Sequence, residues 1–297
     1  MSVHVIPSRR LVIDIETVPA PLATIEAAMP EHVRSPKIPE ELDSPEEPNW
    51  AEKCPKYGGD EAKREAWIAE RKTRWQSEVE AGREKWRIGS HEARAKFIDD
   101  AALDARLGIV KLVGFLAVDE NGETAAKTVF FHEPDRARCD LLRDGICEDV
   151  AKLVVFFDER AMLRRVFADL QRIHDDMIPG VGNPATKLVS YYGHRFDFPF
   201  LYRRGWLNGI PQRPLFQRGR YFVEPMLDLH EFWQMGARDA HTGGLEGLAR
   251  VLGVPGGKTG DGKSFSKWWE ADPVEGVHYL LNDLELTRAC AVRMGAL

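Results

Sequence analysis

Residues 10–16, Arg-Leu-Val-Ile-Asp-Ile-Glu, form an apolar run that carries two acids, and this pattern predicts a buried first strand. Side chains at positions i and i+2 of a strand point to the same face of a sheet. We therefore expect Asp14 and Glu16 to project together, while Ile13 and Ile15 face a core. Neighbouring carboxylates repel unless a cation lies between them, and hard oxygen ligands favour Mg²⁺ or Mn²⁺. Two solvated acids at a strand end are the alternative, so a metal site requires further ligands elsewhere in the chain.

Length and composition restrict the class of protein. A chain of 297 residues accommodates one domain with an insertion, and we expect a single domain over residues 1–297 with an insertion at 30–104. The longest apolar stretch, 109–118, is interrupted by Lys111 and is too short to span a membrane. Four cysteines without metal-like spacing, and no apolar leader, predict a cytoplasmic protein with reduced thiols. The net charge of −6 argues against a protein that coats nucleic acid, but not against an enzyme whose acidic centre takes up cations.

The order of the remaining patterns predicts a mixed α/β fold with one central sheet. Residues 109–118 and 124–131 are β-rich segments on either side of a turn, which is typical of a hairpin. A further strand is expected at 187–191. Helical periodicity marks the segments 158–174, 197–208, 243–253 and 273–294.

The insertion has two parts of different composition. Residues 30–58 are rich in Pro and Glu, which indicates an extended, poorly ordered connection. Residues 60–88 are highly charged and carry an apolar stripe at helical spacing, namely Ile68, Trp75, Val79 and Trp86. We expect Gly89-Ser90 to end this helix and a second, Ala-rich helix to follow at 91–105. The stripe suits a helix docked on the domain, although tryptophans among Arg and Lys also suit an arm that grips nucleic acid or a partner.

A second acidic motif lies in residues 191–201, Tyr-Tyr-Gly-His-Arg-Phe-Asp-Phe-Pro-Phe-Leu. A strand leads through a Gly turn into a helix, and Asp197 lies near the start of that helix, where the dipole and free N–H groups favour a carboxylate. The surrounding phenylalanines place it near the core, where an unsatisfied carboxylate is costly. Asp197 is therefore either a helix cap or a metal ligand.

A third acidic motif lies in the last predicted helix. Asp272-Pro273 is a good helix start, with Asp as the cap and Pro in the first turn. Tyr279 and Asp283 are then at i and i+4 on one face. A phenol beside a metal-binding carboxylate can orient a water molecule. The alternative is a core tyrosine and a solvated surface acid.

Together the three motifs resemble motifs I, II and III of the DEDD superfamily of 3′–5′ exonucleases, which share the ribonuclease H-like fold. More narrowly, residues 191–201 resemble the second motif of the predicted exonucleases related to the proofreading domain of family B DNA polymerases. Residues 227–230 and 244–255 are similar to other segments of the same family. The resemblance extends over residues 10–17 and 105–295.

The resemblance implies a fold, a cofactor and a reaction. The fold is α/β, with a central mixed sheet flanked by helices and a charged helical insertion after the first strand. Two Mg²⁺ or Mn²⁺ ions would be held by Asp14, Glu16, Asp197 and Asp283, to activate a water and to stabilise the leaving 3′ oxygen. Tyr279 would orient that water, because a phenol with a usual pKa of about 10 donates hydrogen bonds more readily than it accepts a proton.

The third motif contains an ambiguity. The superfamily divides by whether a Tyr lies four residues before the Asp or a His lies five residues before it, and here both positions are filled, by Tyr279 and His278. We favour Tyr279, because in a helix that starts at Asp272-Pro273 position i−5 points away from the face of Asp283. His278 could act only if the helix began later, for instance after Gly276.

Candidate substrate contacts adjoin these motifs. Residues 203–220 hold five arginines and interleaved aromatics, which suits phosphate contact and base stacking or else a solvated basic loop. For the Gly-rich loop near residue 258, a flexible loop is the favoured interpretation and a substrate clamp the alternative. Asp228 matches an acidic position in the family, which implies that it supports the site structurally and does not bind the metal directly. The substrate-binding candidates are Thr17, Arg195, Phe196, Arg203, Arg204 and Lys258.

These observations lead to one favoured function and two alternatives. The favoured function is a metal-dependent 3′–5′ exonuclease, a hydrolase that acts on single-stranded DNA in replication or repair. We expect a polymerase or repair protein as a partner in trans, and no association with a membrane. The 3′ polarity rests on the resemblance alone. An exoribonuclease is the first alternative, since nothing in the sequence reads the 2′-OH. A catalytically silent nucleic-acid-binding module on the same fold is the second.

Overall fold

The chain forms two compact units. The computed structural model describes residues 10–56, 60–177, 186–216, 226–237, 242–257, 260, 262 and 265–297. Met1–Ala20 and Ala101–Leu297 make up the first unit, which we call the sheet unit. Pro21–Asp100 make up the second, the helical unit, which includes most of the predicted insertion.

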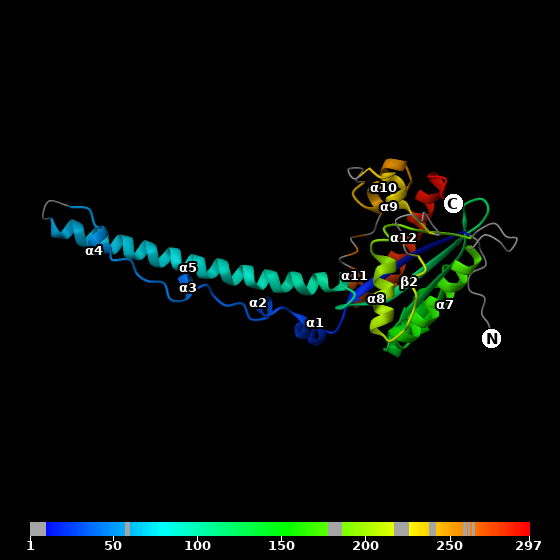
Figure 1. The fold of residues 1–297 in the computed structure, drawn as a ribbon, viewed down its shortest axis with the longest axis horizontal. Coiled ribbons are helices and arrows are strands. Elements are labelled where there is room, and N and C mark those ends of the chain that lie inside the picture. Colours follow the sequence, from blue (N-terminus) through cyan, green and yellow to red (C-terminus); the bar gives the residue numbers. More distant parts are fainter. Residues whose placement is uncertain are drawn as a thin grey trace. The chain divides into compact units, whose positions relative to one another are not determined.

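A six-stranded mixed sheet is the framework of the sheet unit (Figure 1). Its strands are β1 (Arg10–Pro19), β2 (Gly108–Val118), β3 (Thr124–His132), β4 (Lys152–Phe156), β5 (Lys187–Ser190) and β6 (Met226–Asp228). They lie in the order β4-β3-β2-β1-β5-β6. The pairs β1–β2 and β2–β3 are antiparallel, whereas β4, β5 and β6 each run parallel to a neighbour. The predicted hairpin and the predicted α/β class with a central mixed sheet are confirmed.

Helices cover both faces of this sheet. One face packs against α7 (Glu159–Met177) and α8 (Asp197–Leu207), and the other against α6 (Arg136–Gly145), α11 (Phe265–Ala271) and α12 (Pro273–Arg293). The described residues of the unit also form α9 (Leu229–Gln234), α10 (Leu245–Leu252) and most of the 3₁₀ turn η1 (Asp100–Leu103). Among the described segments, no helix has both the length and the apolar character needed to cross a membrane.

The alternation of side chains along β1 follows the predicted period of two. Ile13 and Ile15 belong to the core under α7 and α8, whereas Val12 belongs to the core under α12. Each fully buried aliphatic side chain stabilises the fold by roughly 1.5–3 kcal/mol, which fixes the register of this strand. Asp14 and Glu16 therefore emerge on the side of α12, as their spacing predicts. A bulge between Glu16 and Thr17 shifts the register of the pairing with β2, and bulges of this kind re-aim side chains next to functional sites.

Gly114 allows α12 to lie directly on the sheet. It is the partner of Asp14 in the β1–β2 pairing. A Cβ atom at this position would lie 2.6 Å from Leu284 Cδ1 and 3.0 Å from Leu280 Cδ2. The absence of a side chain at residue 114 thus brings the face of α12 that carries Asp283 close to Asp14.

The helical unit contains no helix end at Gly89-Ser90, so the predicted break at these residues is wrong. A single helix, α5 (Glu61–Asp99), runs through both residues, so the separate helix expected at 91–105 is wrong. One interior Gly costs only about 1 kcal/mol relative to Ala, which does not end a helix of 39 residues. Asp60 begins the helix, since its side chain accepts a hydrogen bond from the Lys63 N–H at 3.2 Å.

The segment before α5 is more regular than an extended connection. It contains α1 (Leu22–Ala28), α2 (Glu31–Arg34), α3 (Glu40–Asp43) and α4 (Trp50–Lys53). Three of these helices follow directly on a proline, whose fixed φ suits the entry to a helix. The segment packs along α5, where Arg83 donates hydrogen bonds to the carbonyls of Leu42 at 2.7 Å and Asp43 at 3.1 Å. The predicted apolar stripe of α5 is accordingly half-buried within the helical unit.

Glu285 joins α12 to the hairpin and makes stability depend on pH. Its carboxylate accepts a hydrogen bond from Thr124 at 2.8 Å and pairs with Lys127 and Arg288, each at 2.8 Å. Burial alone would raise the pKa of Glu285, but the bonds from Lys127, Arg288 and Thr124 outweigh it and hold the pKa below its usual value. A lowered folded-state pKa stabilises the protein above the unfolded-state pKa, near 4.3, and this stabilisation is lost as the pH falls through the folded-state value.

We therefore expect Glu285→Gln to lower the free energy of unfolding at pH 7 by about 1 kcal/mol, a modest loss because the group is partly solvated. The difference from the wild type should shrink as the pH falls from 5 to 3. Urea unfolding at several pH values measures it. Glu123→Gln is the control, because Glu123 is 74% exposed and lies 3.8 Å from the same Arg288. Equal effects of the two variants, or a difference that grows at low pH, would contradict the assignment.

Candidate active site

A cavity of about 170 Å³ opens where α12 crosses the end of β1. Its lining combines side chains from strand β1, helix α8 and helix α12, which are far apart in the sequence. All of the residues predicted to be catalytic line this cavity, namely Asp14, Glu16, Asp197, Tyr279 and Asp283. The three acidic motifs therefore converge on one place in the fold.

Three carboxylates of the cavity are close enough to share one cation. One oxygen each of Asp14, Glu16 and Asp283 lies within 4.8 Å of the others. Glu16 is 8% exposed and Asp283 3% exposed, so their mutual repulsion is poorly screened by water. Oxygens bound to one Mg²⁺ at 2.0–2.1 Å lie at most about 4.2 Å apart, so small side-chain movements suffice to form a site. This all-oxygen donor set fits Mg²⁺ or Mn²⁺ and is unsuited to a soft metal.

Asp197 reaches the same cavity from the start of α8. Its carboxylate is 3% exposed, and the cap position of the helix is held by Phe196, which forms no side-chain cap. The preceding turn is tightly packed, because a Cβ atom at Gly193 would lie 2.1 Å from Ser190 Oγ and 3.3 Å from Asp197 Oδ2. The position of Asp197 thus depends on the turn before it.

The structure separates Tyr279 from His278. The predicted start of α12 is confirmed, since Asp272 accepts a hydrogen bond from the Val274 N–H at 2.9 Å. Tyr279 is 2% exposed and lines the cavity, whereas the side chain of His278 is 47% exposed and does not. The phenol is held by aromatic neighbours: its ring centroid lies 5.1 Å from that of Trp268 and 6.2 Å from that of Phe265.

The predicted substrate contacts divide into several groups. Phe196 lines the cavity, and so does Thr17, whose hydroxyl donates to the Ala102 carbonyl at 2.7 Å. Arg195 is exposed, with its guanidinium over the ring of Tyr192. Lys258 lies outside the residues that the structure describes.

The neighbours Arg203 and Arg204 point in different directions. Arg204 binds the buried carboxylate of Glu159, with 3.0 Å between Nε and Oε1, and donates to the Ala105 carbonyl at 3.0 Å. Arg203 is exposed and lines a second cavity, of about 470 Å³, whose other walls include Trp206 and Phe216. Arg204 therefore joins parts of the fold, and Arg203 remains accessible to a ligand.

We expect Arg204→Met to lower the free energy of unfolding by about 3 kcal/mol, because it leaves the Glu159 carboxylate buried without its cation. Arg203→Met should leave stability unchanged and weaken single-stranded DNA binding, with the salt dependence of log K reduced by about one ion. Thermal unfolding and fluorescence anisotropy at several salt concentrations measure the two effects. A reversed pattern, with binding lost only in the Arg204 variant, would show that the two roles are misassigned.

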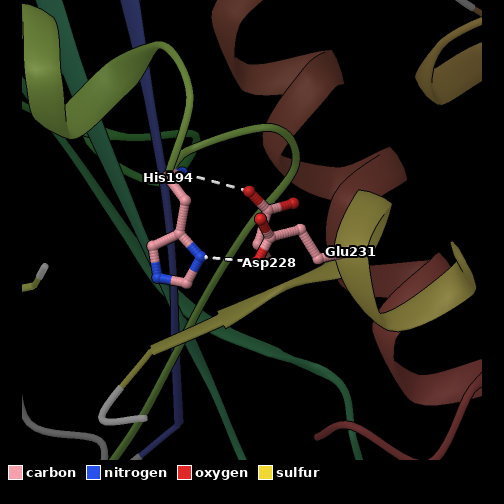
Figure 2. A group of neighbouring side chains, drawn as sticks. All are labelled: His194, Asp228 and Glu231. Atoms are coloured by element: carbon pink, nitrogen blue, oxygen red, sulfur yellow. Dashed lines mark hydrogen bonds and ion pairs between the residues drawn. The ribbon is translucent and has the colours of Figure 1, made fainter. Parts of the chain in front are cut away.

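A second cluster, formed by His194, Asp228 and Glu231, also has three candidate ligand atoms within 4.8 Å of one another (Figure 2). Its hydrogen bonds give it a different character. His194 Nδ1 lies 3.0 Å from Glu231 Oε2. Both Asp228 oxygens accept from backbone N–H groups: Oδ1 from Tyr192 and His230 and Oδ2 from His194, each at 3.0 Å. The oxygens of Asp228 are thus occupied by backbone N–H groups, as expected for the supporting role that the resemblance implies.

The sequence patterns did not identify Gly114 and Thr287, which shape the cavity, and they marked Gly193 only as part of a turn. Gly114 and Gly193 provide space where a side chain would collide with α12 or with Ser190. A glycine inside an apolar strand is a signal of close approach that could have identified Gly114. Thr287, 2% exposed, also lines the cavity, and its spacing of one helical turn from Asp283 could have marked it.

The fold and the cavity define an α/β protein of the ribonuclease H-like type with an acidic, oxygen-rich centre. Residues 158–283 match a family model described as a predicted 3′–5′ exonuclease related to the exonuclease domain of PolB. The predicted resemblance to this family is therefore confirmed. The matched segment includes Asp197, Tyr279 and Asp283, whereas Asp14 and Glu16 precede it. No curated protein matches the chain.

Proposed function

We propose that the protein is a metal-dependent 3′–5′ exonuclease that hydrolyses single-stranded DNA. One observation carries the proposal: oxygens of Asp14, Glu16 and Asp283 gather within 4.8 Å in a cavity that Asp197 and Tyr279 also line. The family match supports the choice of a nuclease. The 3′ polarity and the preference for DNA follow from what that family is related to.

The four carboxylates would hold two divalent cations, because a pair of dications a few ångströms apart needs several negative charges around it. Asp14, Glu16 and Asp283 would be three of the ligands, since one oxygen of each lies within 4.8 Å of the others. Bound Mg²⁺ or Mn²⁺ supplies Lewis acidity towards the attacking water and neutralises charge on the leaving 3′ oxygen. Asp197, which lines the same cavity, would complete the set.

Tyr279 would orient the attacking water by a hydrogen bond from or to its hydroxyl. The ring is fixed by Trp268 and Phe265, so the hydroxyl is held in place before the substrate arrives. A phenol with a usual pKa of about 10 is mostly protonated at neutral pH, which favours water orientation over proton removal.

The terminal nucleotide would be held by groups beside the cavity. Phe196 lines it, and Tyr192 is 39% exposed at its edge, so both rings are available to stack on unpaired bases. Arg203 and Arg195 would contact phosphates of the same strand. A polymerase or repair protein that acts on the same ends is the proposed partner in trans.

Digestion of a single-stranded oligonucleotide labelled at its 5′ end tests this function. We expect Mn²⁺ to give a ladder of products shortened from the 3′ end, and EDTA to prevent it. A strand labelled at the 3′ end should release labelled mononucleotide first. One internal cut would indicate an endonuclease, and faster digestion of a matched RNA an exoribonuclease. Binding without cleavage under any metal would favour the silent module.

A further inference from the structure

The turn between β5 and α8, residues 191–196, is held by a carboxylate outside the candidate active site. Asp228 ends strand β6, and its partner in the parallel pairing with β5 is Ser190, the last residue before the turn. From this place its oxygens accept hydrogen bonds from the backbone N–H groups of Tyr192 and His194, both at 3.0 Å. One side chain thereby fixes the turn at two points.

The turn needs such support because its backbone is strained. Tyr192 has a φ of 67°, in the left-handed region that costs a residue with a side chain roughly 1–2 kcal/mol. Hydrogen bonds from backbone N–H groups to a carboxylate are charge-assisted and stronger than neutral ones. Asp228 is 3% exposed, so water competes little for these bonds. The hydrogen bonds that Asp228 accepts therefore offset the cost of the conformation at Tyr192.

The same turn determines where Asp197 lies. The Phe198 N–H donates to the Gly193 carbonyl at 3.0 Å, which joins the turn to the first residues of α8. A Cβ atom at Gly193 would lie only 3.3 Å from Asp197 Oδ2, so the turn and the carboxylate are in close contact. A shift of the turn would displace Asp197 in the cavity.

From this chain of contacts we propose that Asp228 is a positioning residue, which holds Asp197 at the distance required to bind the divalent metal. The inference rests on the proposed function, since it assigns Asp197 to that metal. Glu231 contacts a side chain of the turn, His194 Nδ1, whereas Asp228 accepts from the backbone N–H groups of Tyr192 and His194, so we expect Glu231 to contribute less to this effect.

A double-mutant cycle on Mn²⁺ binding tests the proposal without measuring activity. Asp228→Asn keeps the shape of the side chain but turns an N–H₂ group towards backbone donors. We expect it to weaken Mn²⁺ binding, measured by calorimetry, by about tenfold, the usual range for groups that orient metal ligands. In the background of Asp197→Asn the same change should weaken binding less than twofold, because the residue it positions is no longer a ligand. Glu231→Gln is the matched control and should leave Mn²⁺ affinity within twofold of the wild type.

Each outcome is decisive. Equal losses in both backgrounds would show a general structural effect and overturn the proposal, as would an unchanged affinity in Asp228→Asn. If that variant does not fold, Asp228→Ser replaces it, with a hydroxyl acceptor and room for water, under the same criteria. A wild-type protein that binds no Mn²⁺ would contradict the proposed function itself. Equal Mn²⁺ affinities of the wild type and Asp228→Asn would contradict only this inference.

Discussion

Asp14→Asn is expected to reduce cleavage of single-stranded DNA by at least about a thousandfold. The residue lies within 4.8 Å of both Glu16 and Asp283, so its loss removes a ligand and a negative charge from the centre of the proposed site. Metal ions contribute several kcal/mol to stabilisation of the transition state, and each 1.36 kcal/mol corresponds to a factor of ten in rate. Initial rates at saturating Mn²⁺ measure the loss.

The same variant should remain folded, and this separates catalysis from stability. Without metal, removing one of three neighbouring carboxylates relieves repulsion, so the melting temperature in EDTA should stay the same or rise. Added Mn²⁺ should raise the melting temperature of the wild type and have less effect on Asp14→Asn. Glu120→Gln, an exposed acid in the turn after β2, is the control and should retain full activity. An Asp14→Asn protein with more than a tenth of wild-type activity would contradict the site.

Tyr279→Phe is expected to lower kcat by about a hundredfold, which is typical for loss of a group that acts on the attacking water. The substitution removes only the hydroxyl, so the packing of the ring against Trp268 and Phe265 is retained. KM and the melting temperature should change little. Single-turnover rates at saturating Mn²⁺ measure the effect.

His278→Ala is the neighbouring control. Its side chain is 47% exposed and lies 3.8 Å from Glu275, on the solvent side of α12. We expect this variant to retain at least half of the wild-type rate. The reverse ranking, with His278→Ala inactive and Tyr279→Phe active, would contradict the assignment of Tyr279 as the residue that orients the attacking water.

Local patterns were sufficient to predict the strand and helix that carry most of the candidate site. The alternation along β1 predicts which side chains of residues 11–16 are buried, because the period of a strand is fixed and one face must enter the core. Asp272-Pro273 predicts the start of α12 and hence the face shared by Tyr279 and Asp283, because cap chemistry is local. The convergence of three distant motifs in one cavity was implied by the family resemblance rather than by any one segment.

Other features depend on contacts between distant segments, which no local pattern reveals. Gly89-Ser90 resembles a helix end, but the rest of α5 continues through it, because the cost of one glycine is small beside the many hydrogen bonds of a long helix. Arg203 and Arg204 are equivalent in sequence, and they are distinguished by contacts with distant residues, namely the buried Glu159 and the Ala105 carbonyl, which bind Arg204. The short edge strand β4 carries few residues and was not predicted. The family resemblance implies a supporting role for Asp228, and the fold shows that its partners are the backbone N–H groups of Tyr192 and His194.

The proposed metal site is tested most directly by the location of Mn²⁺ in crystals of the protein soaked with MnCl₂, from anomalous difference density. We expect two peaks in the cavity, within ligand distance of Asp14, Glu16, Asp197 and Asp283. Density only at the cluster of His194, Asp228 and Glu231, or none in the cavity at an Mn²⁺ concentration that supports cleavage, would contradict it.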